Sequence, residues 1–166
     1  SAYFRDRAFV TAVITGAATY MLMNFVMTAA PLAMIGCNHS IDDAAYGIQW
    51  HVIAMYAPSF FTGNLIMRYG APRIVALGLA LTAISAVVAL LGITVMHFYI
   101  ALILLGLGWN FGYIGASAMV ADTARPEERT RVQSVNDFCV FGVMAIGSFS
   151  SGQIVTTYGW DMVNWV

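Results

Sequence analysis

Residues 74–96, IVALGLALTAISAVVALLGITVM, form a continuous apolar run without a charged side chain. A helix rises about 1.5 Å per residue, so about 20 apolar residues cross the hydrocarbon core of a bilayer. Strands of a membrane barrel would be about ten residues long and would alternate in polarity, which this run does not. The stretch therefore predicts a transmembrane helix and an all-α integral membrane protein.

The rest of the chain repeats this pattern. Further apolar runs cover about residues 8–35, 47–67, 98–121 and 132–157, and a sixth helix begins at about residue 161. Of the 166 residues, 60% are hydrophobic and 9% are charged, whereas soluble domains carry about 25% charged residues. We expect one transmembrane domain over residues 1–166, a polytopic helix bundle surrounded by lipid. The formal net charge of −1 argues against a nucleic-acid partner.

Every basic residue is an arginine, and the arginines fall at one end of every apolar run. They precede the first run, separate the second from the third, and separate the fourth from the fifth: Arg5, Arg7, Arg68, Arg73, Arg125, Arg129 and Arg131. In a chain that crosses the membrane back and forth, these positions share one side. Because arginine-rich short loops mark the cytoplasmic side, we expect these loops in the cytoplasm and the protein in a bacterial inner membrane.

Small residues recur along the run at 98–121. Gly108 and Gly112 have the GxxxG spacing, which lets the backbone of another helix approach closely. No strand precedes Gly106, so Gly106 and Gly108 do not form a dinucleotide fingerprint. We expect a close helix–helix contact along this run.

The segment GNLIMRYGAPR, residues 63–73, resembles the signature that follows the second helix of a half in the major facilitator superfamily. That signature reads Gly-x-x-x-Asp-Arg-x-Gly-x-Arg-Arg. The chain matches it at Gly63, Arg68, Gly70 and Arg73, and departs from it at Met67 and Pro72. The loop RPEERTR at 125–131 is similar to the family's Pro-x-x-Arg loop, and residues 147–152 and 158–160 are similar to its fifth helix and the turn that follows.

This resemblance covers nearly the whole chain and implies half of a major facilitator fold. The first half of the family has a fuller signature and often an arginine within its fourth helix, whereas this chain has no charge in that run before Asp122. The departures favour the C-terminal half, with helices 7–11 and the start of helix 12. The partner would then be the missing N-terminal half, or a second membrane subunit.

The resemblance implies a secondary active transporter of a small organic solute that works by alternating access. Such a transporter needs two halves around a site at the midplane. Two alternatives remain: a structural or accessory transmembrane subunit of a larger complex, and a membrane enzyme. The sequence has no nucleophile–base pair, P-loop or cofactor motif, which argues against an enzyme and predicts no cofactor. The polar side chains within the apolar runs are mostly neutral, which favours a neutral or aromatic solute.

Polar side chains within apolar runs are the candidate solute contacts, because they are costly in lipid and often functional. Tyr20, Asn24 and Thr28 lie four residues apart and share one helix face. The resemblance implies that this helix lines the central cavity. The alternative is hydrogen bonding between helices, which contributes only about 0.6 kcal/mol on average.

Trp109, Asn110 and Tyr113 lie near the middle of the run at 98–121. An aromatic side chain beside an amide suits a solute that both stacks and hydrogen-bonds. The alternative is a packed tryptophan beside an asparagine whose hydrogen bonds are satisfied within the protein. His51, at the outer part of the second run, completes the expected solute-binding set. We expect Asn24 and Asn110 to face the central cleft.

Four charged residues near the cytoplasmic level are the candidate gating residues: Arg68, Arg73, Asp122 and Asp137. Asp137 is the acid embedded within an apolar run, and it either carries protons or pairs with an arginine at the same level. Pairing is the favoured interpretation, with Arg68, Arg73 or Arg131. The resemblance implies a latch between Arg73 and Asp122 that closes the inner gate.

Three histidines fall towards the outer side, near two acids: His39, His51, His97, Asp42 and Asp43. Their spacing matches no zinc motif. We therefore expect no metal site.

Overall fold

The computed structural model describes residues 5–166. In chain order the helices are α1 (Arg7–Gly36), α2 (Ile41–Tyr56), α3 (Ser59–Tyr69), α4 (Ala71–Leu91), α5 (Val95–Asp122), the 3-10 turn η2 (Pro126–Glu128), α6 (Arg129–Tyr158) and α7 (Trp160–Trp165). No strand occurs in the described part of the chain. The predicted all-α fold class is confirmed.

Four helical segments are long and apolar enough to cross a membrane. They are α1, α4, α5 and the segment Pro126–Tyr158, which contains α6. Apart from Asp137 of α6, the charged residues of these segments lie near their ends. The predicted polytopic transmembrane bundle is therefore confirmed, and the chain is an integral membrane protein.

The run expected at 47–67 is two helices rather than one. α2 begins earlier, at Ile41, because Ser40 and Asp43 form a capping box in which the Ser40 hydroxyl accepts from the Asp43 N–H at 3.0 Å. α2 ends at Tyr56, just before Pro58. Proline has no N–H, and its ring clashes with the carbonyl four residues back, so the chain breaks and restarts as α3.

The turn between α4 and α5 also lies earlier than the apolar pattern indicates. α4 ends at Leu91, and α5 begins at Val95 because the Thr94 hydroxyl accepts from the His97 N–H at 3.3 Å. The apolar pattern alone extends the third run to Met96. A threonine cap within a largely apolar stretch accounts for the difference.

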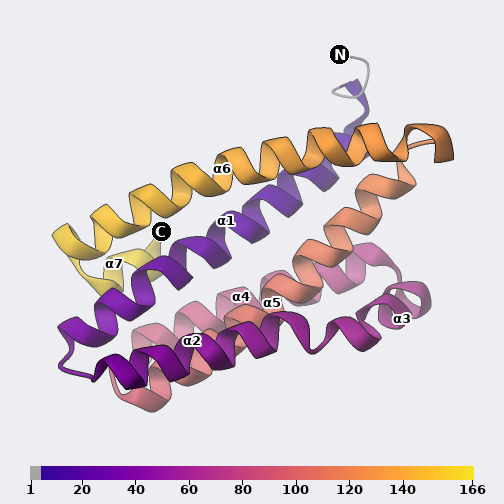
Figure 1. Cartoon of the computed structure of the whole chain (residues 1–166). Helices are drawn as coiled ribbons and strands as arrows, with labels where there is room; N and C mark the ends of the chain where they lie inside the picture. The colour runs from indigo at the N-terminus through magenta and orange to yellow at the C-terminus, as the bar shows by residue number, and fades with distance from the viewer. Residues whose placement is uncertain (1–4) are drawn as a thin grey trace.

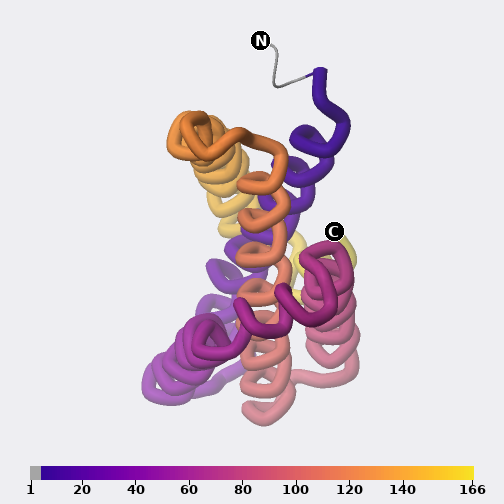
Figure 2. The backbone as a smooth tube through the Cα atoms, turned by 90° about the vertical axis from the view of Figure 1, so that its right-hand side faces the viewer, coloured from indigo at the N-terminus to yellow at the C-terminus, as the bar shows by residue number. Residues whose placement is uncertain are grey.

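α5 is the central helix of the bundle and packs against α1, α2 and α4. α6 lies along α1, and the two run in the same direction (Figure 1). Seen along the bundle, α5 lies between α2 and α4, and α6 lies with the first part of α1 above them (Figure 2). Residues from α1, α2, α5 and α6 can therefore meet around the middle of α5.

Glycines allow the close contact between α4 and α5. A Cβ atom built on Gly78 of α4 would lie 2.7 Å from the Gly108 carbonyl oxygen of α5, with the Gly112 backbone also in its way. A Cβ on Gly106 would lie 2.6 Å from the His51 carbonyl oxygen of α2. The close approach predicted from the Gly108–Gly112 spacing is confirmed, and it sets α5 firmly between two neighbours.

The three arginine-bearing segments gather at one end of the bundle. The start of α1, the end of α3 and the loop from α5 to α6 all lie at the right-hand end in Figure 1, and the turns between α1 and α2 and between α4 and α5 lie at the other. This end is called the arginine end below. The arrangement is the one expected for a chain that crosses back and forth.

Candidate functional site

The middle of the bundle holds a group of contacting aromatic rings. Trp109 and Tyr113 of α5 are stacked, with ring centroids 5.3 Å apart and planes 13° from parallel. Tyr20 of α1 meets both rings edge-on, at 5.5 Å from Trp109 and 5.0 Å from Tyr113. The structure thus brings together three of the residues that the sequence singled out, from two different helices.

Two further rings extend this group. Tyr56, in the last turn of α2, lies 5.7 Å from Trp109, and Phe141 of α6 lies 5.6 Å from Tyr20. The five residues are called the aromatic cluster: Tyr20, Tyr56, Trp109, Tyr113 and Phe141. Tyr56 and Phe141 were outside the expected solute-binding set, because no spacing within one helix links an aromatic residue to rings on another helix.

The aromatic cluster has a buried centre and exposed outer members. Trp109 is only 6% exposed, whereas Tyr56 and Phe141 are 56% and 45% exposed. Edge-to-face pairs at such distances contribute about 0.5–1.5 kcal/mol beyond the area they bury. The Trp109 Nε1 is buried without a hydrogen-bond acceptor. Chemically, the cluster offers apolar ring faces together with phenol and indole donors, which suits a flat aromatic molecule.

Tyr20, Asn24 and Thr28, which share one face of α1, have different partners in the structure. Tyr20 belongs to the aromatic cluster, whereas the Thr28 hydroxyl lies 3.1 Å from that of Ser148 on α6 and joins the two helices. Asn24 lies between them and is half-buried. Among residues 5–166 no hydrogen bond engages its side chain. Thr28 therefore follows the interhelical alternative, and Asn24 keeps a free amide one turn from Tyr20.

His51 is fully buried between α2 and α5. Its Nδ1 lies 2.8 Å from the Leu102 carbonyl oxygen, and since a carbonyl only accepts, Nδ1 carries the proton in this pair. Nε2 is buried without a partner. The expectation of a histidine that contacts solute is not met in this structure, because the close α2–α5 crossing at Gly106 encloses the ring.

Asn110 is also enclosed, and this corrects the expectation that it faces a cleft. Its Nδ2 donates to the Met55 carbonyl at 2.6 Å and to the Ser59 hydroxyl at 2.8 Å. Its Oδ1 accepts from the Thr62 hydroxyl at 2.6 Å. The side chain is 0% exposed. Both amide hydrogens are used at the break between α2 and α3, so none is left for a solute.

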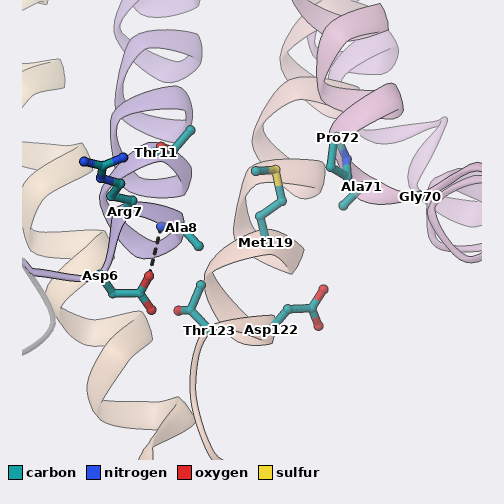
Figure 3. Close-up of a pocket in the computed structure, with 10 residues that line it drawn as sticks. All are labelled: Asp6, Arg7, Ala8, Thr11, Gly70, Ala71, Pro72, Met119, Asp122 and Thr123. Carbon is teal, nitrogen blue, oxygen red and sulfur yellow. Dashed lines mark hydrogen bonds between the residues drawn. The ribbon is translucent and has the colours of Figure 1, made fainter.

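A groove of about 900 Å³ opens at the arginine end, between the starts of α1 and α4 and the end of α5. Figure 3 shows the ten residues that line it: Asp6, Arg7, Ala8, Thr11, Gly70, Ala71, Pro72, Met119, Asp122 and Thr123. The Asp6 carboxylate caps α1 by accepting from the Ala8 N–H at 2.9 Å. Asp122 is exposed on the rim. Three charged side chains, those of Asp6, Arg7 and Asp122, therefore line the groove among small and apolar residues.

The expected gating arginines do not reach Asp122 in this conformation. Within residues 5–166, no ion pair joins Asp122 to Arg68 or Arg73. The Arg68 guanidinium instead lies 5.4 Å from the ring centroid of Tyr69, and Arg73 is exposed. The latch was expected for an outward-open state of a complete transporter, and it stays a prediction for that state.

Asp137 lies on α6 beside the aromatic cluster. It is half-buried, and its carboxylate is close enough to Tyr113 for the two groups to interact electrostatically. In the described part of the chain it forms no ion pair with Arg68 or Arg73. The expected pairing with either of these arginines is therefore absent in this structure.

Comparison with known proteins agrees with the features described above. The family model of the Major Facilitator Superfamily matches residues 9–166. The chain is 56% identical over 162 residues to the riboflavin transporter RfnT of Brucella anthropi, a match that covers 98% of this chain and 41% of the relative. It matches no solved structure.

Two relatives from Bacillus subtilis are more distant. The uncharacterized MFS-type transporter YddS is 33% identical over 137 residues, which cover 81% of this chain and 31% of the relative. The uncharacterized MFS-type transporter YdeG is 34% identical over 139 residues, which cover 82% and 32%. The chain thus spans less than half the length of each of these relatives.

The family model, the relatives and the helical bundle agree with the resemblance read from residues 63–73. They indicate a transporter rather than an enzyme. The chain belongs to the Major Facilitator Superfamily.

Proposed function

We propose that this chain is the C-terminal six-helix half of a secondary active transporter that works by alternating access. The absence of a charge in α5 before Asp122 and the eroded signature at residues 63–73 support the assignment to this half. The second half, or a partner membrane subunit, would complete the central site. The bacterial relatives and the shared arginine end support a bacterial inner membrane, with that end in the cytoplasm.

The proposed solute is a flat aromatic heterocycle of the flavin type. The aromatic cluster carries this proposal, because its ring faces and buried donors suit a fused ring system with carbonyl and ring-nitrogen acceptors. The 56% identity to a protein named as a riboflavin transporter supports the same class of solute. A structural subunit would need no such cluster.

The residues have distinct proposed roles. Tyr20, Trp109 and Tyr113 stack with the solute, and Tyr56 and Phe141 form its open rim. The free amide of Asn24 offers two donors and an acceptor without the cost of a charge in the membrane. Asp137, beside Tyr113, and the pair Arg73–Asp122 act in gating. His51, Asn110 and Thr28 serve helix contacts rather than the solute.

The experiment is riboflavin uptake by a bacterial riboflavin auxotroph that lacks its own importer and expresses the full-length protein. Tyr113→Ala and Phe141→Ala should reduce uptake about tenfold or more, which corresponds to about 1.4 kcal/mol of lost interaction. Phe138→Ala is the matched control, since Phe138 lies one turn away on α6 and is 83% exposed. No uptake by the wild type, or equal loss in the control, would refute the assignment of solute or site.

A further inference from the structure

α3 contacts α4 and α5 but buries a single side chain against them. Thr62 is its only buried residue, and Phe60 and Met67 on the same helix are 92% and 80% exposed. The hydroxyl of Thr62 lies 2.6 Å from Asn110 Oδ1 and 2.7 Å from the Pro58 carbonyl oxygen. Apart from the half-buried Leu65 and Ile66, the position of α3 therefore depends on hydrogen bonds at its first turns rather than on an extensive apolar interface.

Asn110 connects both helices of the break. It donates to the Met55 carbonyl, which belongs to α2, and to the Ser59 hydroxyl, which belongs to α3. In an unbroken helix the N–H of Ser59 would serve the Met55 carbonyl. Here the buried amide of a third helix takes that role, and it accepts from Thr62 as well. Hydrogen bonds in so dry an environment are strong, and their loss is costly.

The break between α2 and α3, where Asn110 binds, lies next to the aromatic cluster. Asn110 follows Trp109 directly in α5, and Tyr56, whose ring lies 5.7 Å from Trp109, is the last residue of α2 before the break. At its other end, α3 leads through Gly70 (φ +88°) into α4, at the arginine end. Trp109 is therefore one residue from the amide that holds α3, and Tyr56 is one residue from the Met55 carbonyl to which that amide donates.

We propose that Asn110 is a positioning residue that clamps α3 in this arrangement, and that release of the clamp lets α3 swing about Ala57–Pro58 at the arginine end. It acts through Met55, Ser59 and Thr62 and does not touch the solute. The further statement that solute in the aromatic cluster biases this clamp rests on the proposed function.

The test uses the full-length protein in lipid nanodiscs, with Cys37 and Cys139 replaced by alanine. Spin labels at Met67→Cys on α3 and Ile100→Cys on α5 report the position of α3 by pulsed electron paramagnetic resonance. A second pair, Ile53→Cys on α2 and Leu79→Cys on α4, is the control for the rest of the bundle. All four positions have exposed side chains.

Three variants probe the clamp without solute. Thr62→Val keeps the shape of the side chain and removes the hydroxyl, Thr62→Ser restores a hydroxyl, and Asn110→Leu removes the amide. Thr62→Val and Asn110→Leu should add a second, broader α3–α5 distance, whereas Thr62→Ser and the control pair should match the wild type. If Asn110→Leu fails to fold, Thr62→Val still decides. Unchanged distances in Thr62→Val would overturn the proposal.

Measurements with riboflavin test the clamp and the proposed function independently. Thr62→Val should bind riboflavin within about threefold of the wild type but transport it at least about tenfold more slowly. A Thr62→Val protein that transports like the wild type would overturn the coupling of the clamp to the cycle. If the wild type binds no riboflavin, the proposed solute is wrong, and the distances measured without solute still decide whether Asn110 holds α3.

Discussion

At the scale of single residues, similar polar side chains within the membrane have different roles according to their neighbours. Asn24 and Asn110 are both amides inside apolar helices, yet one is free and the other has both amide hydrogens bound at a helix break. Thr28 pairs with Ser148, and its neighbour on the same stripe, Tyr20, joins the aromatic cluster. The partners, rather than the residue types, decide which groups are left for a solute.

Asn24 and Thr28 provide a matched test of solute contact. Asn24→Ala should lower the affinity for riboflavin about threefold to tenfold, the range for one lost neutral hydrogen bond. Thr28→Ala should change the affinity little, because the Thr28 hydroxyl is used by Ser148. Titration of the purified full-length protein, followed by quenching of flavin fluorescence, measures both. Equal losses in the two variants would contradict the separation of roles along this stripe.

The same residues show where sequence reasoning stops. Tyr20, Trp109 and Tyr113, which the structure brings together, could be singled out from the sequence because aromatic groups beside polar ones stand out in apolar helices. For Asn110 two roles stayed open, contact with a solute and hydrogen bonds within the protein, since a mid-membrane amide suits a solute and a freed carbonyl equally well. Tyr56 and Phe141 were missed because their contacts cross between helices and leave no periodic signal.

At the scale of helices, glycine sets the distance between α4 and α5. Gly78→Ala would drive a methyl group into the backbone at Gly108 and Gly112, where no side chain can move aside. Overpacking of this kind typically costs about 1–3 kcal/mol. Gly142 on α6 has no neighbouring atom within 4 Å of an added Cβ, so Gly142→Ala should be neutral or slightly stabilising.

Thermal unfolding of the full-length protein in detergent compares the two glycine variants. The melting temperature should fall for Gly78→Ala and stay within a few degrees, or rise, for Gly142→Ala. A Gly78→Ala protein as stable as the wild type would mean that α4 and α5 lie further apart than described here.

Two prolines show the limit of reading helix ends from sequence. Pro31 lies within the unbroken helix α1, whereas Pro58 separates α2 from α3. Both occur in apolar runs of similar character, and both remove one backbone donor. Beside Pro58, the Met55 carbonyl, which would accept from the Ser59 N–H in a continuous helix, accepts instead from Asn110 on a distant helix, and this stabilises the break. That partner is a tertiary contact, which explains why the apolar runs located the spans but not this break.

At the scale of the whole molecule, the distribution of arginine predicts the orientation. Thr130, in the first turn of α6, lies at the arginine end, and Ser40 caps α2 at the opposite end. Single cysteines at these positions, in a cysteine-free full-length protein, should react differently in intact cells. An impermeant thiol reagent should label Ser40→Cys and leave Thr130→Cys unlabelled. The reverse pattern would overturn the orientation.

The arginine end is also where the proposed gate closes. Arg73 and Asp122 are not paired in this conformation, and each is exposed. In an outward-open state of the complete transporter they should approach within salt-bridge distance, because the inner ends of the helices then come together. Asp122→Asn should shift the conformational balance towards the inward-open state while leaving the melting temperature nearly unchanged, since exposed pairs contribute only about 0–1 kcal/mol. Distances between spin labels across the inner face measure this balance.

The central claim is that the aromatic cluster is part of the solute-binding site of a flavin transporter. A cryo-electron microscopy structure of the full-length protein with riboflavin tests it most directly. The claim predicts that the fused ring system stacks on Trp109 and Tyr113, with Tyr20 at its edge and Asn24 within hydrogen-bond distance. Riboflavin bound away from these rings, or a cluster that stays packed while riboflavin occupies another site, would contradict it.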